Sequence, residues 1–179
     1  MDLQERFEFR NVEPDEAEQT VEIEGICFPP NEACKPDMMR QRVAKAPELF
    51  LVAVDKETGK LAGFLNGLST NEDTLRDEFF TNADLYDPEG ENIMILGLDV
   101  LPQYRRQGLA TELMRRYQLR EKDIGRKNII LTCLPSKVRM YEKMGFLDLG
   151  ISGSSWGGEL WHEMKVVLNG QGPSQTELQ

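Results

Sequence analysis

Residues 98–111 combine the residue types that can hold an anion at the start of a helix. An apolar stretch runs into Arg105 and Arg106, and Gly108 and Ala110 follow where a helix is expected to begin. The first backbone N–H groups of a helix lack partners within it, and the helix dipole gives them partial positive charge. Because Gly108 and Ala110 carry little bulk, a phosphate group can approach these amides. The segment predicts a phosphate-binding turn, although a solvated helix start beside a basic face explains the same residues.

The helix expected after this turn is basic, whereas the whole chain of 179 residues carries a formal charge of -10. The helix and the loop after it carry the basic residues Arg115, Arg116, Arg120, Lys122, Arg126 and Lys127. This contrast predicts a specific polyanionic ligand. The overall acidic excess argues against a nucleic-acid binder, which needs a basic surface for phosphates. It permits a cationic substrate.

The sequence lacks the usual motifs of other nucleotide-binding proteins, of serine hydrolases and of zinc sites. The P-loop pattern and the nucleophile-elbow pattern G-x-S-x-G do not occur, and G-x-G-x-x-G is incomplete. The single histidine, His162, and three cysteines without a CxxC pair (Cys27, Cys34, Cys133) make a zinc site improbable. Such cysteines indicate reduced thiols in a cytoplasmic protein. With no run of ~18 apolar residues and no signal-like N-terminus, we expect neither membrane insertion nor secretion.

The elements expected around the turn form one α/β domain over residues 1–168, followed by a polar tail at 169–179. With 40% hydrophobic residues, the chain can bury a core of its own. Strands are expected at residues 7–10, 49–54, 61–69, 93–101 and 128–134, at a short strand from Phe146, and at 159–168. Helices are expected at residues 14–27, 36–45, 107–124 and 135–145. Residues 71–92 are strongly acidic and predict a solvated connection with a short helix.

Two motifs resemble those of one family. The string Arg105-x-x-Gly108-x-Ala110 is similar to the first signature of the GNAT superfamily of acyl-CoA-dependent N-acetyltransferases. About thirty residues on, the string from Tyr141 to Phe146 reads Tyr-Glu-Lys-Met-Gly-Phe and resembles its second signature. The resemblance implies the GNAT fold, a mixed and mostly antiparallel sheet of about six to seven strands flanked by about four helices. It also implies that the strands at 93–101 and 128–134 splay apart.

Within the superfamily, the chain most resembles the arylalkylamine (serotonin) N-acetyltransferase group. The similarities are Phe28-Pro29 after an acidic helix, the long polar insertion between Ser69 and Asn92, Thr132-Cys133 before Tyr141, and the segment 157–164. The group's acceptors imply a small primary amine, arylalkylamine-like or polyamine-like. Acetyl-CoA would be the co-substrate, no metal would be needed, and the enzyme would be a monomer or homodimer.

The resemblance also implies roles for individual residues. The pantetheine arm of coenzyme A would pair with Leu98, Asp99 and Val100. Arg105 opens the first motif, and the pyrophosphate would lie on the amides of Arg106, Gln107, Gly108, Leu109, Ala110 and Thr111. The acceptor would contact Phe28, Pro29, Glu159 and Trp161. Tyr141 would be the general acid that protonates the leaving thiolate, because a phenol of pKa near ~10 can give a proton and recover it from solvent.

The proton acceptor is where the sequence departs from the subgroup. Met94 and Leu96 occupy the positions of its two histidines, and neither can titrate. A water chain, a carboxylate (Glu32, Asp99 or Glu159) or a less basic amine would each meet the need. If Trp161 lines the acceptor pocket, His162 should point away, since neighbouring strand residues face opposite sides. Cys133 could form an acyl-cysteine, but the family implies direct attack in a ternary complex.

Two other functions stay open. A protein or peptide N-acetyltransferase would need an open groove, whereas long loops at 71–92 and 150–158 would close over a small molecule. A non-catalytic acyl-CoA-binding module would explain the missing histidines.

Overall fold

The structure is a computed structural model that describes residues 2–169. Its helices are α1 (Leu3–Arg6), α2 (Ala17–Cys27), α3 (Pro36–Lys45), α4 (Glu78–Thr81), α5 (Leu109–Ile124) and α6 (Val138–Lys143). Its strands are β1 (Phe7–Asn11), β2 (Phe50–Asp55), β3 (Leu61–Thr70), β4 (Asn92–Val100), β5 (Asn128–Cys133), β6 (Leu147–Ile151) and β7 (His162–Val167). These strands form one sheet in the order β1-β2-β3-β4-β5-β7-β6.

Strands β4 and β5 are the one parallel pair among these strands, and they separate soon after they meet. They pair only from Asn92 opposite Asn128 to Met94 opposite Ile130. The register of β4 against β3 then shifts, so that Gly97 lies opposite Asn66. A bulge of this kind bends the strand and increases its twist. The predicted splay between these two strands is therefore confirmed, and so is the mixed, mostly antiparallel sheet.

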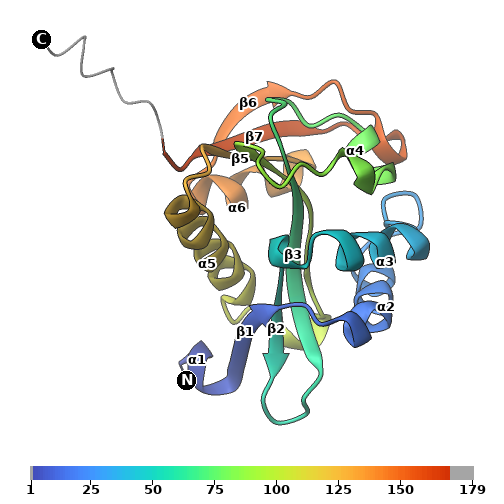
Figure 1. Cartoon of the computed structure of the whole chain (residues 1–179), viewed down its shortest axis with the longest axis vertical. Helices are drawn as coiled ribbons and strands as arrows, with labels where there is room; N and C mark the ends of the chain where they lie inside the picture. The colour runs from blue at the N-terminus through green and yellow to red at the C-terminus, as the bar shows by residue number, and fades with distance from the viewer. Residues whose placement is uncertain (1, 170–179) are drawn as a thin grey trace, which may run out of the picture.

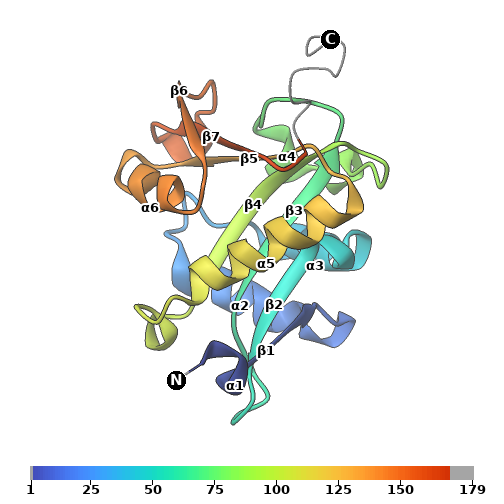
Figure 2. The same cartoon turned by 90° about the vertical axis from the view of Figure 1, so that its left-hand side faces the viewer.

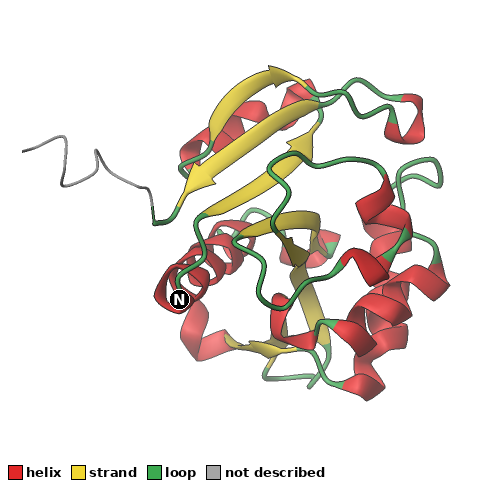
Figure 3. Cartoon of the chain, turned by 45° about the horizontal axis from the view of Figure 1, so that its top comes forward, coloured by secondary structure: helices red, strands yellow, loops and turns green. Residues whose placement is uncertain are grey.

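The helices cover both faces of the sheet (Figures 1 and 3). Helices α2 and α3 lie on one face, where Ile23, Met39 and Val43 pack against Phe50 and other buried residues of β2 and β3. Helix α5 lies across the other face of β2, β3 and β4 (Figure 2). Its buried apolar residues are Leu109, Leu113, Met114 and Tyr117. This packing fixes the direction of α5 and places its N-terminus at the end of β4.

Three local predictions need correction. Helix α5 begins at Leu109 instead of residue 107, because Gly108 is its N-cap with a left-handed backbone. The last strand begins at His162 instead of residue 159, because Trp156–Gly158 form a short 3₁₀ turn. The connection 71–92 is not merely solvated, since Leu75 and Phe79 are buried in the core. Of the predicted tail 169–179, all but residue 169 lies outside the described residues.

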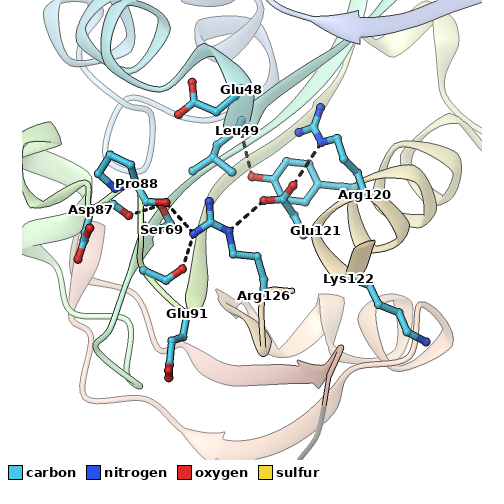
Figure 4. Close-up of polar contacts among 12 residues, drawn as sticks. Glu48, Leu49, Ser69, Asp87, Pro88, Glu91, Arg120, Glu121, Lys122 and Arg126 are labelled. Atoms are coloured by element: carbon cyan, nitrogen blue, oxygen red, sulfur yellow. Dashed lines mark hydrogen bonds and ion pairs between the residues drawn. The ribbon is translucent and has the colours of Figure 1, made fainter. Parts of the chain in front are cut away.

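A buried ionic cluster holds the other end of α5 (Figure 4). Glu121 is fully buried, and its carboxylate lies 3.3 Å from Arg120 Nε and 3.5 Å from Arg126 Nε. Arg126 Nη1 also donates to the carbonyl oxygens of Pro88 and Gly90. The cluster thereby joins the C-terminal end of α5 to the turn that precedes β4. The cluster therefore positions α5 and β4, and the N-terminus of α5 meets the C-terminal end of β4 at the site.

Replacing Arg126 with alanine should lower the free energy of unfolding by about 3 kcal/mol or more, because it leaves a buried carboxylate poorly paired. Urea denaturation monitored by circular dichroism measures the change. Arg115→Ala is the matched control, since Arg115 pairs with Glu112 on the exposed side of the same helix and should change stability little. Equal stability of the two variants would contradict this assignment.

Candidate active site

A cavity of about 650 Å³ extends from the N-terminus of α5 through the gap between β4 and β5 to the loops beyond α2. Leu96, Gly97 and Leu98 line it from β4, and Leu131 and Thr132 line it from β5. The paired part of the two strands ends before these residues. The splay therefore opens a slot whose walls are strand backbones.

The turn before α5 exposes backbone N–H groups toward this cavity. Arg106 and Gly108 both have left-handed backbones, with φ of 61° and 83°. The first helical hydrogen bond runs from Glu112 N to Gly108 O, so the amides of residues 109–111 are not used by the helix. A Cβ built on Gly108 would meet no atom within 4 Å, which leaves open space over these amides. Successive N–H groups in such a turn form an anion-binding concavity.

Arg105 fastens the turn to the strand before it. Its Nε donates to Val100 O at 2.9 Å, and the Cys27 thiol donates to the same carbonyl at 3.4 Å. The end of β4, the turn and the end of α2 are thus held together. The residues present fit a diphosphate with a thiol-bearing arm, because the exposed amides continue directly into the slot.

Tyr141 reaches the cavity from α6, across the slot from β4. Its ring packs edge-on against Phe146, with centroids 5.8 Å apart. Burial raises the pKa of Tyr141, and the neighbouring Cys133 and Asp99 raise it further. The phenol therefore stays protonated at neutral pH and can act as a proton donor.

The basic residues of α5 do not form the ligand site that the sequence predicted. Arg115 and Arg116 both donate hydrogen bonds to the Glu112 carboxylate. Arg120 donates to the side chain of Asn11, at the end of β1. Their charges are used within the protein. The basic residues that line the cavity are Arg105, Arg106 and Lys137.

Aromatic side chains form the wall at the far end of the cavity. Phe28, Phe80, Trp156 and Trp161 line it, and Phe80 stacks on Trp156 with centroids 5.0 Å apart. Trp161 Nε1 donates to the backbone oxygen of Trp156 at 2.8 Å, which orients the Trp161 indole. The wall is apolar, and Glu24 and Glu32 are the carboxylates that line the same cavity.

Three loops are joined over this aromatic end. Asn31 Nδ2 donates to Gly157 O at 3.0 Å, and Trp156 Nε1 donates to Glu32 O at 2.9 Å. The side chains of Ser154 and Asp77 also share a hydrogen bond. These contacts connect residues more than 70 positions apart in the chain. We call this bridge, formed by residues 28–32, 77–80 and 154–158, the roof.

Most of the predicted site residues line the cavity, and three do not. Asp99 is fully buried behind it, Gln107 bonds Arg6 at the surface, and Glu159 is exposed. Glu159 acts only at a distance: burial raises the pKa of Glu32, and the charge of Glu159 adds to that shift. The residues found on the cavity are Phe28, Pro29, Leu98, Val100, Arg105, Arg106, Gly108, Leu109, Ala110, Thr111, Tyr141 and Trp161.

Sequence reasoning missed Glu24, Phe80 and Trp156 as lining residues. Glu24 lies within a helix rich in acidic residues, and Phe80 lies in an acidic connection, so neither carried a motif. The pair Trp156 and Trp161, separated by the four residues Gly-Gly-Glu-Leu, was the one available signal.

Residues 2–169 contain neither a cluster of metal-binding side chains nor a histidine that lines the cavity. No three His, Cys, Asp or Glu side chains in this part of the chain are placed to hold a metal ion. His162 Nδ1 lies 3.1 Å from both oxygens of Asp148 and does not line the cavity. Over the same residues, no helix has the length and apolar character to cross a membrane.

Solved structures show the same fold. The chain is similar to the loading GNATL domain of CurA from Lyngbya majuscula, with a TM-score of 0.79, 13% identity, and coverage of 90% of this chain and 98% of that one. It is also similar to Ard1 from Thermoplasma volcanium, with a TM-score of 0.69, 18% identity and coverage of 90% and 97%. The ribosomal-protein-S18-alanine N-acetyltransferase from Escherichia coli gives a TM-score of 0.67, 16% identity and coverage of 94% and 97%.

Sequence comparison identifies the family. A search of curated proteins found no significant match. Residues 13–146, however, match the profile described as the Acetyltransferase (GNAT) family. That span includes the splayed strands, the turn before α5 and Tyr141. The chain therefore belongs to the GNAT family of acetyltransferases.

Proposed function

We propose that the protein transfers an acetyl group from acetyl-CoA to the primary amine of a small molecule, with an arylalkylamine as the preferred acceptor. The roof carries this proposal. A polypeptide acceptor needs a groove open at both ends, whereas Asn31, Glu32 and Asp77 are bonded to the loop at 154–157 across the acceptor end. The aromatic wall beneath the roof suits a ring, and the carboxylates beside it suit an ammonium group.

The geometry supports direct transfer in a ternary complex. Coenzyme A supplies an acyl thioester when bound, and the amides of residues 109–111 would hold its diphosphate. The strand edge at Gly97 and Leu98 would pair with its arm and aim it at Tyr141, which lines the same slot. Tyr141 would give its proton to the departing sulfur. Burial raises the pKa of the Cys133 thiol to about 12, so this side chain is a poor nucleophile for an acyl-enzyme route.

Polypeptide N-acetylation is the alternative, since similar structures include the S18-alanine N-acetyltransferase and the NatC complex bound to Gag peptide. Acetyl-CoA with a panel of free amines and a peptide library separates the two, with thiol release as the readout. We expect release with arylalkylamines and none above background with peptides. Release with peptides alone would contradict the proposal.

Gly108→Ala should weaken coenzyme A binding at least tenfold, a change of about 1.4 kcal/mol, because its Cβ would enter the space over the helix amides. Isothermal titration calorimetry measures the affinity. Gly125→Ala is the matched control, since Gly125 caps the opposite end of α5 with the same left-handed backbone. If both variants bind equally well, the diphosphate lies elsewhere.

Tyr141→Phe should lower kcat about 100-fold while it leaves the affinity for acetyl-CoA unchanged, because it removes only the proton donor. Cys133→Ala should keep turnover within a few fold under direct attack. Steady-state kinetics and calorimetry supply the two readouts. A Tyr141→Phe enzyme with normal kcat would show that another group protonates the sulfur.

A further inference from the structure

A cluster of buried polar groups lies beneath the cavity beside Gly97, and no part in proton transfer has yet been given to it. Glu24 contributes from α2, Asp99 from β4, Asn66 from β3 and Arg42 from α3. Their side chains are nearly or fully buried, with exposed fractions of 5%, 0%, 1% and 1%. Burying this many polar groups is costly unless they serve each other or a ligand.

Three atoms of the cluster converge on one point at the cavity floor. A Cβ built on Gly97 would lie 3.0 Å from Asp99 Oδ1, 3.1 Å from Asn66 Nδ2 and 3.5 Å from Glu24 Oε1. None of these three atoms has a hydrogen-bond partner among the described residues. Because residue 97 is glycine, no side chain of its own fills that point. Gly97 and Glu24 both line the cavity, so this point lies just beneath the cavity surface.

The charges in the cluster indicate which carboxyl carries a proton. Arg42 brings one positive charge, and two ionised carboxylates beside it would leave an uncompensated buried charge. Burial raises the pKa of Asp99 well above its usual range, and the neighbouring charge of Glu24 raises it further. Asp99 is therefore the carboxyl that holds the proton. Cys34 N donates to Glu24 Oε2 at 2.8 Å, and the buried Oε1 accepts no hydrogen bond from the described residues.

We propose that Glu24, with Asp99 as its positioning partner, takes the proton that the acceptor's ammonium group must lose before its nitrogen can attack. This deepens the proposed function and rests on it. An N–H bond of the ammonium breaks, and an O–H bond forms on Glu24. The freed nitrogen lone pair forms the C–N bond, the C–S bond breaks, and the sulfur takes the Tyr141 proton. The nitrogen then loses its second proton, which returns through solvent to the Tyr141 oxygen, and Glu24 releases its own proton to solvent.

This assignment answers the chemical problem set by Met94 and Leu96, which offer no titratable group. An alkylammonium of pKa near ~10 is only about one part in a thousand free amine at pH 7, so an internal proton acceptor raises the usable fraction. The other titratable or charged groups that face Glu24 are Asp99, Arg42, Cys27 and Cys34, with Arg105 beyond Cys27 and Tyr141 beyond Asp99.

The test compares Glu24→Gln with the wild-type enzyme on two matched amines. One is 2-phenylethylamine, and the other is its β,β-difluoro analogue, whose ammonium is much more acidic. We expect Glu24→Gln to lower kcat/KM about 100-fold for the first amine at pH 7 and less than about fivefold for the second. Its kcat/KM for 2-phenylethylamine should rise about tenfold per pH unit between pH 6 and 9, whereas the wild-type value should be nearly flat.

Two controls keep the outcomes distinct. Glu22→Gln, on an exposed position of the same helix, should behave as wild type, and calorimetry should give Glu24→Gln normal coenzyme A affinity. Equal slowing of both amines by Glu24→Gln, or none, would overturn the assignment while acetylation by the wild type still supports the proposed function. A wild-type enzyme that acetylates neither amine would overturn the proposed function, and this inference with it.

Discussion

The separation of β4 from β5 is the constraint on which the site depends. Two parallel strands that stayed paired would satisfy each other's backbone groups and leave no room between them. Here the pairing ends at Met94, and the shifted register at Gly97 bends β4 away. The slot this creates has strand backbone on both sides, the exposed amides of α5 at one end and Tyr141 at its wall. The separation of these two strands thus gives a ligand space, backbone groups for hydrogen bonds and an orientation toward Tyr141.

Burial raises the pKa of two acidic groups around this slot. Tyr141 stays protonated because burial raises the pKa of its phenol. In the cluster below, burial and the neighbouring charge of Glu24 raise the pKa of Asp99. Acyl transfer from a thioester to an amine needs both a proton donor and a proton acceptor at one cavity. The surface charges of α5 contribute to neither function.

The elements that the sequence predicted best are those whose signal is local. The apolar run of β4, the glycine turn before α5 and the string around Tyr141 each lie within about twenty residues, and each predicted both a structure and a ligand contact. The one error in these segments, the predicted start of α5, is also local. Helix α5 begins two residues late, because a left-handed Gly108 ends the turn before the helix can start.

The acceptor end could not be predicted in this way, because it is assembled from distant segments. Glu24, Phe80 and Trp156 meet only after α2, the connection to β4 and the last hairpin fold against each other. Glu159 shows the reverse case: the resemblance implied a contact with the acceptor, but the 3₁₀ turn before it leaves its side chain exposed.

The most direct test of this picture is to follow the backbone amides of the isotopically labelled protein by NMR during titration with coenzyme A. We expect the largest chemical-shift changes at residues 106–111 and 97–100, on either side of the same slot. Large changes elsewhere, with these two segments unmoved, would contradict the assignment of the slot as the coenzyme A site.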